Sequence, residues 1–265
     1  MKRVKTFLYF LFFVMACVGL VSAAETDLKK PVRNIAPALT PERAISLPEK
    51  IPVVQNQWPQ WINSAKKSIR TGIPQWVNMV GLKDGIVNGA NVTEGSLAGP
   101  SPSAMLTPTM MADGVPNSII NGLMGPVAEA VTSWASSVRV PNLPWYPSFL
   151  VVPAPIATPT KSPATPLAAL IQTRAFLEPS MLTMTIQTRL GKEAATPEAQ
   201  AAIKEFCTWF YSGFSTWLST ATIKEVLGTG PVPTFNPAAN IHSGPVVKGT
   251  ANGGVITPAP VWSVP

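Results

Sequence analysis

The chain has 265 residues and a formal net charge of +7, from 20 lysines and arginines against 13 aspartates and glutamates. Only 12% of the residues are charged and 46% are hydrophobic, whereas typical globular proteins are about 25% charged. This balance excludes disorder driven by charge repulsion. The basic residues are spread too thinly for the clustered phosphate contacts of a nucleic-acid-binding protein.

The first 24 residues have the three parts of a secretory signal peptide. Lys2, Arg3 and Lys5 precede an apolar run over residues 7–21, and small residues follow up to Ala24. This order predicts export to the periplasm or cell envelope with residues 1–24 removed. Two alternatives stay open: a retained N-terminal anchor, because the uncharged run is close to the length that spans a bilayer, and a lipoprotein attached through Cys17.

Four regions are predicted along the chain. The signal peptide is followed by an extended leader over residues 25–57, where five prolines prevent a long helix. Residues 58–164 and 165–265 are predicted as two helical modules, each ending in a proline- or glycine-rich arm. The 29 prolines are roughly twice the usual share of about 5%.

The fold predicted from these patterns is mainly α, with amphipathic helices and long irregular segments. The clearest helix is 197–227, with Thr196 as N-cap and a buried face that includes Phe206, Phe210 and Phe214. Its predicted end is at Gly228, Gly230 and Pro231. Further helical stretches are predicted at 117–138, broken near Pro126; at 165–190, split near Pro179; and, more weakly, at 59–70 and 74–80. Residues 84–115, 140–164 and 228–265 are predicted to be non-helical, with short strands only at 150–152 and 245–247.

Similar residue runs suggest two or three diverged repeats of a helix followed by an arm. The run from Val131 to Ser137 resembles the run from Phe214 to Thr220, and each contains a tryptophan at its centre. Trp61 and the residues after it are a candidate third member. Chance matching in a chain rich in serine, threonine and tryptophan is the alternative.

No catalytic, cofactor-binding or metal-binding constellation is predicted. After the signal peptide the chain has one histidine, His242, and one cysteine, Cys207, whereas zinc sites need three or four such ligands. Nucleophile-elbow and nucleotide-binding motifs are missing from the sequence. His242 is predicted to be solvated in a loop. Cys207 is predicted to be a buried thiol on an apolar helix face, with a link between two copies as the alternative.

The tryptophans are the strongest candidates for partner contact. Tryptophan is enriched at interfaces because it combines a large apolar surface with one hydrogen-bond donor. Trp209 and Trp217 are predicted to lie in the core. The candidates for partner contact lie beside prolines or in tails and are Trp58, Trp61, Trp76, Trp145 and Trp262. The alternative is that these side chains anchor loops onto their own fold.

The function predicted from the sequence is that of a non-enzymatic structural or scaffolding subunit in an exported, envelope-associated assembly. Its predicted partners are other protein subunits or copies of itself, close to the membrane, with no nucleic acid and no cofactor. Low charge, high proline content and scattered tryptophans support this hypothesis. A module that binds carbohydrate or cell-wall polymer through exposed tryptophans is the first alternative, and a hydrolase using His242 is the second.

Overall fold

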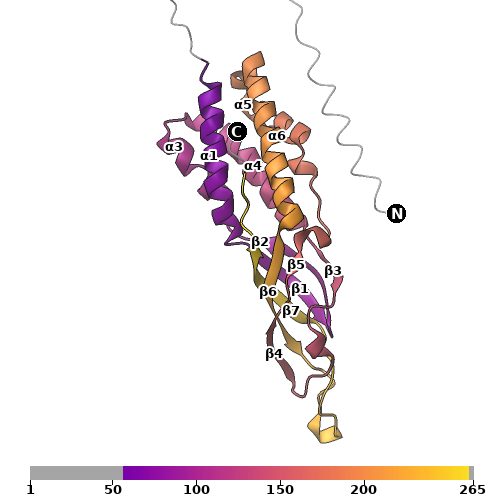
Figure 1. Cartoon of the computed structure of the whole chain (residues 1–265). Coiled ribbons are helices and arrows are strands. Elements are labelled where there is room, and N and C mark those ends of the chain that lie inside the picture. The colour runs from indigo at the N-terminus through magenta and orange to yellow at the C-terminus, as the bar shows by residue number, and fades with distance from the viewer. Residues whose placement is uncertain (1–55, 263–265) are drawn as a thin grey trace, which may run out of the picture. The chain divides into compact units, whose positions relative to one another are not determined.

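The computed structural model describes residues 56–262, whose helices and strands are shown in Figure 1. The longer helices are α1 (Trp58–Val77), α4 (Asn117–Ser137), α5 (Pro179–Leu190) and α6 (Pro197–Thr220), and the shorter ones are α2 (Ser103–Leu106) and α3 (Pro108–Ala112). The strands are β1 (Gly81–Asn88), β2 (Asn91–Ala98), β3 (Val140–Leu143), β4 (Ile156–Lys161), β5 (Thr165–Pro166), β6 (Thr222–Pro231) and β7 (Gly249–Thr257). Single turns of 3-10 helix are η1 (Pro147–Leu150), η2 (Leu167–Ala169), η3 (Ala175–Leu177), η4 (Gly191–Ala194) and η5 (Pro237–Ala239).

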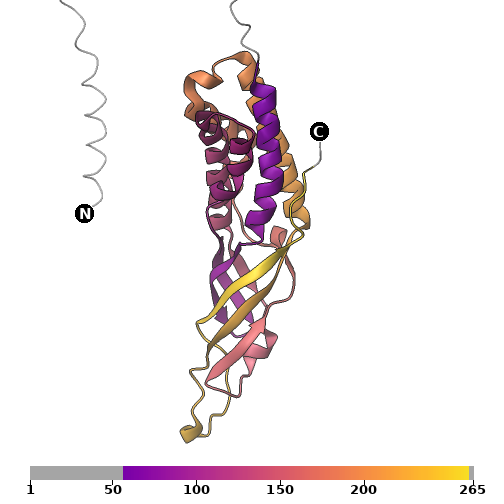
Figure 2. The same ribbon diagram turned by 90° about the vertical axis from the view of Figure 1, so that its left-hand side faces the viewer.

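The strands of the described residues form one antiparallel sheet of seven strands. Its order is β3-β2-β1-β7-β6-β4, and β5 pairs with the beginning of β6. Strands β1 and β2 form a hairpin in which Asn88 pairs with Asn91, whereas β6 and β7 pair along most of their length from Thr222 and Thr257 onward. Residues on both sides of position 164 therefore contribute strands to the same sheet. Figure 2 shows the long helices side by side, with the sheet continuing from one end of the helical layer.

The aromatic side chains that precede and form η1 are packed into the fold. Trp145, Tyr146 and Phe149 are buried, and the rings of Tyr146 and Phe149 stack with their centroids 5.0 Å apart. The Tyr146 hydroxyl donates a hydrogen bond to the carbonyl oxygen of Val226 in β6 at 2.7 Å. Burial raises the pKa of Tyr146, so this hydroxyl stays protonated and remains a donor.

The prediction of a mainly α fold with irregular arms is wrong. The segments predicted as non-helical arms contain most of the sheet as far as residue 262, and residues 84–115 also contain the short helices α2 and α3. The runs that end α4 and α6 lead into the strands β3 and β6, so the predicted helix-plus-arm description does not hold for them. The predicted strands at 150–152 and 245–247 are also wrong, because Leu150 lies in η1 and Val152 makes only an isolated bridge with Gly244.

The strands were hard to predict because their alternation is interrupted. Asp84, Glu94 and Glu225 have positive φ angles of 60°, 60° and 59° within β1, β2 and β6, and each breaks the two-residue period of a regular strand. Gly228 resembles a helix stop in the sequence but is a strand residue whose missing side chain leaves room for the Tyr146 ring.

The helix boundaries also differ from the prediction. Helix α6 begins as predicted at Pro197 but ends at Thr220, because the next residues pair with β7. Of the predicted helix 165–190 only α5 is an α-helix, and Pro179 begins it instead of splitting it, since the first helical position needs no amide donor.

Two prolines lie inside helices that the sequence predicts to be interrupted. Helix α4 continues through Pro126, and α1 joins the predicted segments 59–70 and 74–80 through Pro74. A proline inside a helix removes one hydrogen bond and crowds the carbonyl four residues earlier. Pro126 is buried, and we attribute the continuity of α4 to packing that outweighs this local cost. Pro74 lies in the last turn of α1 beside the buried residues Ile73 and Trp76, and we attribute the continuity of α1 to their packing as well.

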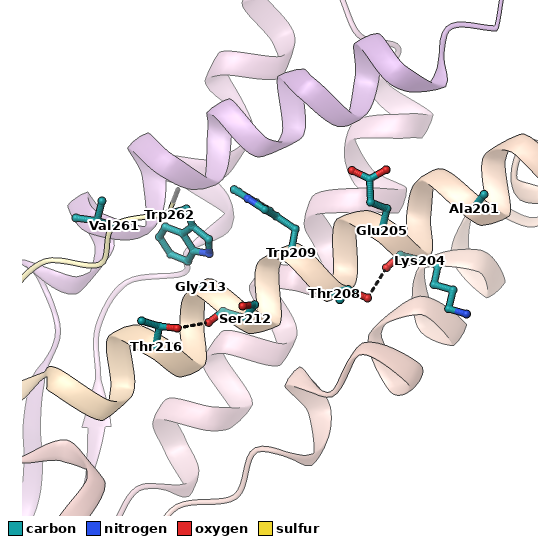
Figure 3. Close-up of a pocket in the computed structure, with 10 residues that line it drawn as sticks. All are labelled: Ala201, Lys204, Glu205, Thr208, Trp209, Ser212, Gly213, Thr216, Val261 and Trp262. Atoms are coloured by element: carbon teal, nitrogen blue, oxygen red, sulfur yellow. Dashed lines mark hydrogen bonds between the residues drawn. The ribbon is translucent and has the colours of Figure 1, made fainter. Parts of the chain in front are cut away.

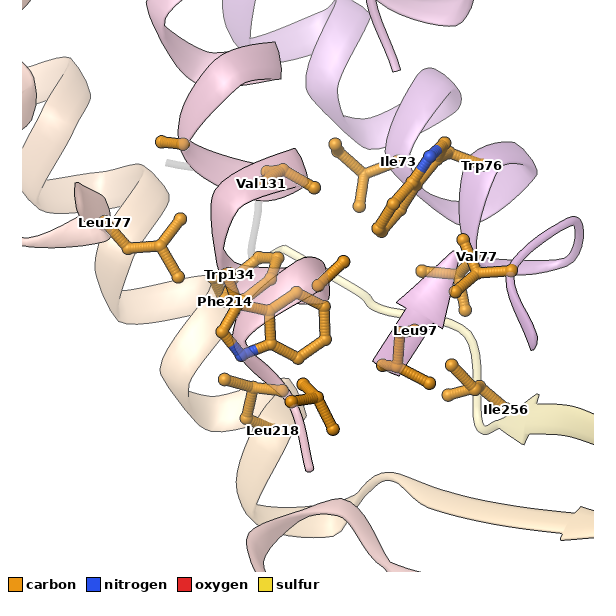
Figure 4. Close-up of a cluster of buried hydrophobic side chains, with 14 of the residues drawn as sticks. Ile73, Trp76, Val77, Leu97, Val131, Trp134, Leu177, Phe214, Leu218 and Ile256 are labelled. Atoms are coloured by element: carbon orange, nitrogen blue, oxygen red, sulfur yellow. The ribbon is translucent and has the colours of Figure 1, made fainter. Parts of the chain in front are cut away.

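A cluster of buried hydrophobic side chains lies where the helical layer joins the sheet (Figure 4). Trp134 of α4 lies edge-to-face with Phe214 and Trp217 of α6, with ring centroids 5.1 and 5.8 Å apart. Leu97 of β2 and Ile256 of β7 extend this cluster into the sheet. One hydrophobic core therefore includes both helices and strands.

Among residues 56–262 no helix has both the length and the hydropathy needed to cross a bilayer. The predicted signal peptide, and the leader as far as residue 55, lie outside the described residues.

Candidate functional site

A surface groove runs along α6 beside the C-terminal segment, and we call it the α6 groove. Its volume is about 740 Å³, within the range of about 300–1,000 Å³ typical of ligand pockets. Its lining, drawn in Figure 3, consists of Ala201, Lys204, Glu205, Thr208, Trp209, Ser212, Gly213, Thr216, Val261 and Trp262. Two indole rings and one exposed valine therefore lie among mostly neutral polar groups.

The sequence around Thr196 explains how α6 begins. The Thr196 hydroxyl oxygen accepts a hydrogen bond from the Ala199 amide at 3.2 Å, which confirms the predicted N-cap. Pro197 occupies the first turn, and Glu198 places a negative charge near the positive end of the helix dipole. These features fix where α6 begins, and the spacing of its apolar residues determines which face is buried.

The groove-facing side of α6 is polar but its hydroxyl groups are partly satisfied within the helix. Thr208 donates to the carbonyl oxygen of Lys204 at 2.9 Å, and Thr216 donates to that of Ser212 at 2.9 Å. These bonds turn the hydroxyls toward the helix backbone. The threonine methyl groups are consequently available to the groove.

Trp262 is held against α6 by shape and by one hydrogen bond. Its indole nitrogen donates to the carbonyl oxygen of Phe210 at 3.2 Å, and its ring stacks on Phe210 with an interplanar angle of 11°. The ring lies where a side chain at residue 213 would project, so only Gly213 leaves room for it. Val261, by contrast, is 82% exposed at the edge of the groove.

Trp209 lies between the groove and α1. The Lys66 ammonium is 5.7 Å from its ring centroid and the Arg70 guanidinium is 5.4 Å away, so two cations of α1 face one indole. The Lys66 side chain is only 6% exposed and forms an ion pair of 2.8 Å with Glu205. The indole nitrogen of Trp209 is buried and has no hydrogen-bond acceptor among the described residues.

The structure places the five predicted contact tryptophans in different surroundings. Trp58, Trp76, Trp145 and Trp262 are buried against their own fold. The Trp76 indole donates to the carbonyl oxygen of Pro100 at 2.8 Å, as in the alternative in which tryptophans anchor loops. Trp262 lines the α6 groove, and Trp61 is half-buried in a separate pocket. The five side chains do not form one common surface.

The sequence analysis missed Trp209 as a site residue because it assigned Trp209 to the core. Its ring is only partly buried, whereas the predicted core residue Trp217 is buried. The sequence pattern does indicate that Trp209 is not fully buried, because Trp209 lies outside the series Phe206, Phe210 and Phe214 that defines the buried face of α6.

The two residues considered for chemistry lie apart from the groove. Cys207 is buried and unpaired, as predicted, and burial raises the pKa of its thiol to about 11. His242 is exposed, as predicted, in the connection between β6 and β7. Within residues 56–262, no group of three or more histidine, cysteine, aspartate or glutamate side chains is arranged to hold a metal ion.

Comparisons of the chain with protein-family models, with curated proteins and with solved structures found no significant match.

Proposed function

We propose that the protein is a non-enzymatic subunit of an exported, cell-envelope-associated assembly, and that its α6 groove binds an extended, uncharged segment of another protein subunit. The observation that carries this proposal is the apolar surface inside the groove, where Trp209 and Trp262 lie beside the exposed Val261. Exposed apolar surface in a concave setting is typical of protein-binding sites.

The lining of the groove favours an extended, largely apolar chain as the bound group. The indole nitrogen of Trp209 is buried and is not accessible from the groove, so Trp209 contributes apolar ring surface to the lining. Grooves lined by aromatic rings bind proline-containing extended chains well, because such chains lose little conformational entropy on binding. An extended segment also fits the length of a groove that follows a helix.

The charges around the groove favour a partner of low charge. Lys204 and Glu205 are adjacent and opposite in sign, and the other lining residues are neutral. Lys66 lies beneath the groove but is paired with Glu205. A strongly acidic or strongly basic segment would therefore gain little attraction and would lose hydration on entering.

Export remains part of the proposal on sequence grounds. The basic start, the apolar run and the small residues before Glu25 support secretion to the periplasm or envelope. The low proportion of charged residues supports a surface that is partly covered by partner subunits.

The test is site-specific photocrosslinking in the cells that encode the protein. A photoreactive amino acid replaces Thr208, which is exposed and lines the groove, and the envelope is extracted under mild conditions. We expect a crosslink to one defined protein and a native mass above that of a monomer. Thr208→Arg, which fills the groove with a long charged side chain, is expected to reduce the complex at least tenfold.

Ser219→Arg is the matched control, because Ser219 is exposed on the same helix and does not line the groove. The complex should persist in this variant. A native extract in which the protein sediments as a monomer, or a complex that survives Thr208→Arg unchanged, would contradict the proposal.

A further inference from the structure

A second pocket lies between α1 and the loop that follows α3, and we call it the α1–α3 pocket. Its volume is about 400 Å³, and it shares no lining residue with the α6 groove. Helix α1 contributes Gln60, Trp61 and Asn63 to its lining, and the loop contributes Asp113. The pocket lining therefore includes one aromatic ring, the side-chain amides of Gln57, Gln60 and Asn63, and the oppositely charged Lys67 and Asp113.

The Asp113 carboxylate is held in place from α1. The Ser64 hydroxyl donates to its Oδ2 at 2.8 Å, and the Lys67 ammonium lies 3.4 Å from its Oδ1. The hydrogen bond from Ser64, helped by Lys67, lowers the pKa of Asp113, so the group is ionised at neutral pH. Each carboxylate oxygen can accept more than one hydrogen bond, so Asp113 retains capacity for a ligand.

The aromatic wall of the pocket is also positioned by its neighbours. The Trp61 ring lies edge-to-face with that of the buried Trp58, at a centroid distance of 5.2 Å and an interplanar angle of 76°. Trp61 is itself only partly buried. Its indole therefore presents apolar surface beside polar groups, without needing to reorient.

The amides of Gln60 and Asn63 are available for hydrogen bonds. Gln60 and Asn63 are exposed, and their side chains bond to no other residue of the described part of the chain. Each amide offers both a carbonyl acceptor and an NH₂ donor. A ligand with several hydroxyl groups, each both donor and acceptor, matches this set.

The charge of the pocket favours an uncharged ligand. Lys67 and Asp113 are oppositely charged and adjacent, so their charges largely cancel. A phosphorylated or acidic ligand would meet the Asp113 carboxylate, and a cationic one would meet Lys67. A neutral ligand with hydroxyl groups avoids both repulsions.

We infer that the α1–α3 pocket binds a neutral hexose unit of an oligosaccharide or cell-wall glycan. The apolar C–H face of the sugar ring packs on the Trp61 indole. Its hydroxyls exchange hydrogen bonds with Gln60, Asn63 and the Asp113 carboxylate. This inference does not depend on the proposed binding of a protein segment in the α6 groove.

Calorimetric titration tests the inference with the chain that begins at Glu25. The probes are maltotriose, cellotriose and N,N′,N″-triacetylchitotriose, each raised to 10 mM. We expect at least one to bind and to change the tryptophan fluorescence. Trp61→Ala is expected to weaken that binding at least tenfold, and Trp61→Phe, which keeps an aromatic ring, is expected to weaken it less.

A double variant and a control distinguish loss of sugar binding from loss of folding. Gln60→Ala combined with Asn63→Ala changes only exposed side chains and is expected to weaken binding several-fold while the circular dichroism spectrum is unchanged. Thr208→Arg in the α6 groove serves as the control and should leave the affinity for the sugar unchanged. The inference is overturned if none of the three sugars binds at 10 mM, or if the variants at positions 60, 61 and 63 bind as tightly as the original chain.

Discussion

At the scale of single residues, burial determines which polar groups remain available. Cys207 and Tyr146 are removed from water, so the pKa of each is raised and each stays protonated. Asp113 lies at the surface with a donor from Ser64, so its pKa is lowered and it stays charged. The sequence indicated the burial of Cys207 from its helix face, whereas the Ser64–Asp113 pair joins residues far apart in the chain.

The first prediction concerns the reactivity of Cys207 in the chain that begins at Glu25, where it is the only cysteine. Burial raises the pKa of this thiol from 9.0 to about 11. Because only the thiolate reacts, we expect a disulfide reagent at pH about 8 to modify the native protein at least 100-fold more slowly than the guanidinium-unfolded protein. The release of reagent thiolate, followed by absorbance, measures both rates.

The same shift has a consequence for stability. The folded thiol holds its proton to higher pH than the unfolded thiol. The contribution of this protonated thiol to the free energy of unfolding is therefore complete below pH about 9 and is lost as the pH rises toward about 11. Cys207→Ser has no such thiol and is the matched control. Equal reaction rates for native and unfolded protein would show that Cys207 is accessible.

At the scale of the elements, contacts between tryptophan rings and backbone groups attach residues 258–262 to α6. Trp217 and Trp262 both donate to backbone carbonyls, of Pro258 and Phe210 respectively, at 2.8 and 3.2 Å. These bonds hold residues 258–262 against α6. Sequence patterns identified α6 but gave no indication that the ring of Trp262, far along the chain, packs against its Gly213.

The second prediction is that Gly213→Ala detaches Trp262 from α6. The added methyl group would occupy the space of the indole ring, although alanine is itself the better helix former. We expect a red shift of tryptophan emission and a loss of about 1–3 kcal/mol in the free energy of unfolding. Both are measurable in one guanidinium titration followed by fluorescence.

A double-mutant cycle separates this contact from other effects. In a Trp262→Ala background the ring is gone, so Gly213→Ala should no longer destabilise the protein. Ser212→Ala, an exposed change in the same turn, is the control for helix propensity. If Gly213→Ala lowers the free energy of unfolding by the same amount with and without Trp262, the contact between Gly213 and Trp262 is contradicted.

At the scale of the whole described unit, helices and sheet share one core. Trp134, Phe214 and Leu218 of the helices lie in the same cluster as Leu97 and Ile256 of the sheet (Figure 4). Neither layer buries its inner face without the other, so we expect them to unfold together.

The third prediction tests this cooperativity with Trp134→Ala. Trp134 is buried, and its indole nitrogen donates to Gln172 at 2.7 Å. Its removal is expected to cost about 3–5 kcal/mol. Hydrogen exchange followed by mass spectrometry should show the opening free energies of peptides from α4 and from β7 falling by the same amount. A loss of protection confined to α4, with β7 unchanged, would indicate two independent layers.

The sequence by itself determined the features that depend on neighbouring residues. The Thr196 N-cap, the apolar face of α6 and the burial of Cys207 follow from spacing within one helix, and the structure contains all three. Helices are easy to recognise in a sequence because their contacts join residues that are only three or four positions apart.

Only the tertiary structure decided the sheet and both pockets. Strand pairing joins residues far apart, as Gly85 with Ala251, and the positive φ angles at Asp84 and Glu225 conceal the strands from pattern analysis. The α6 groove likewise requires Trp262 to return to Gly213, and the α1–α3 pocket requires Asp113 to meet Ser64. Such contacts become favourable only after the chain between them has closed, so no local pattern encodes them.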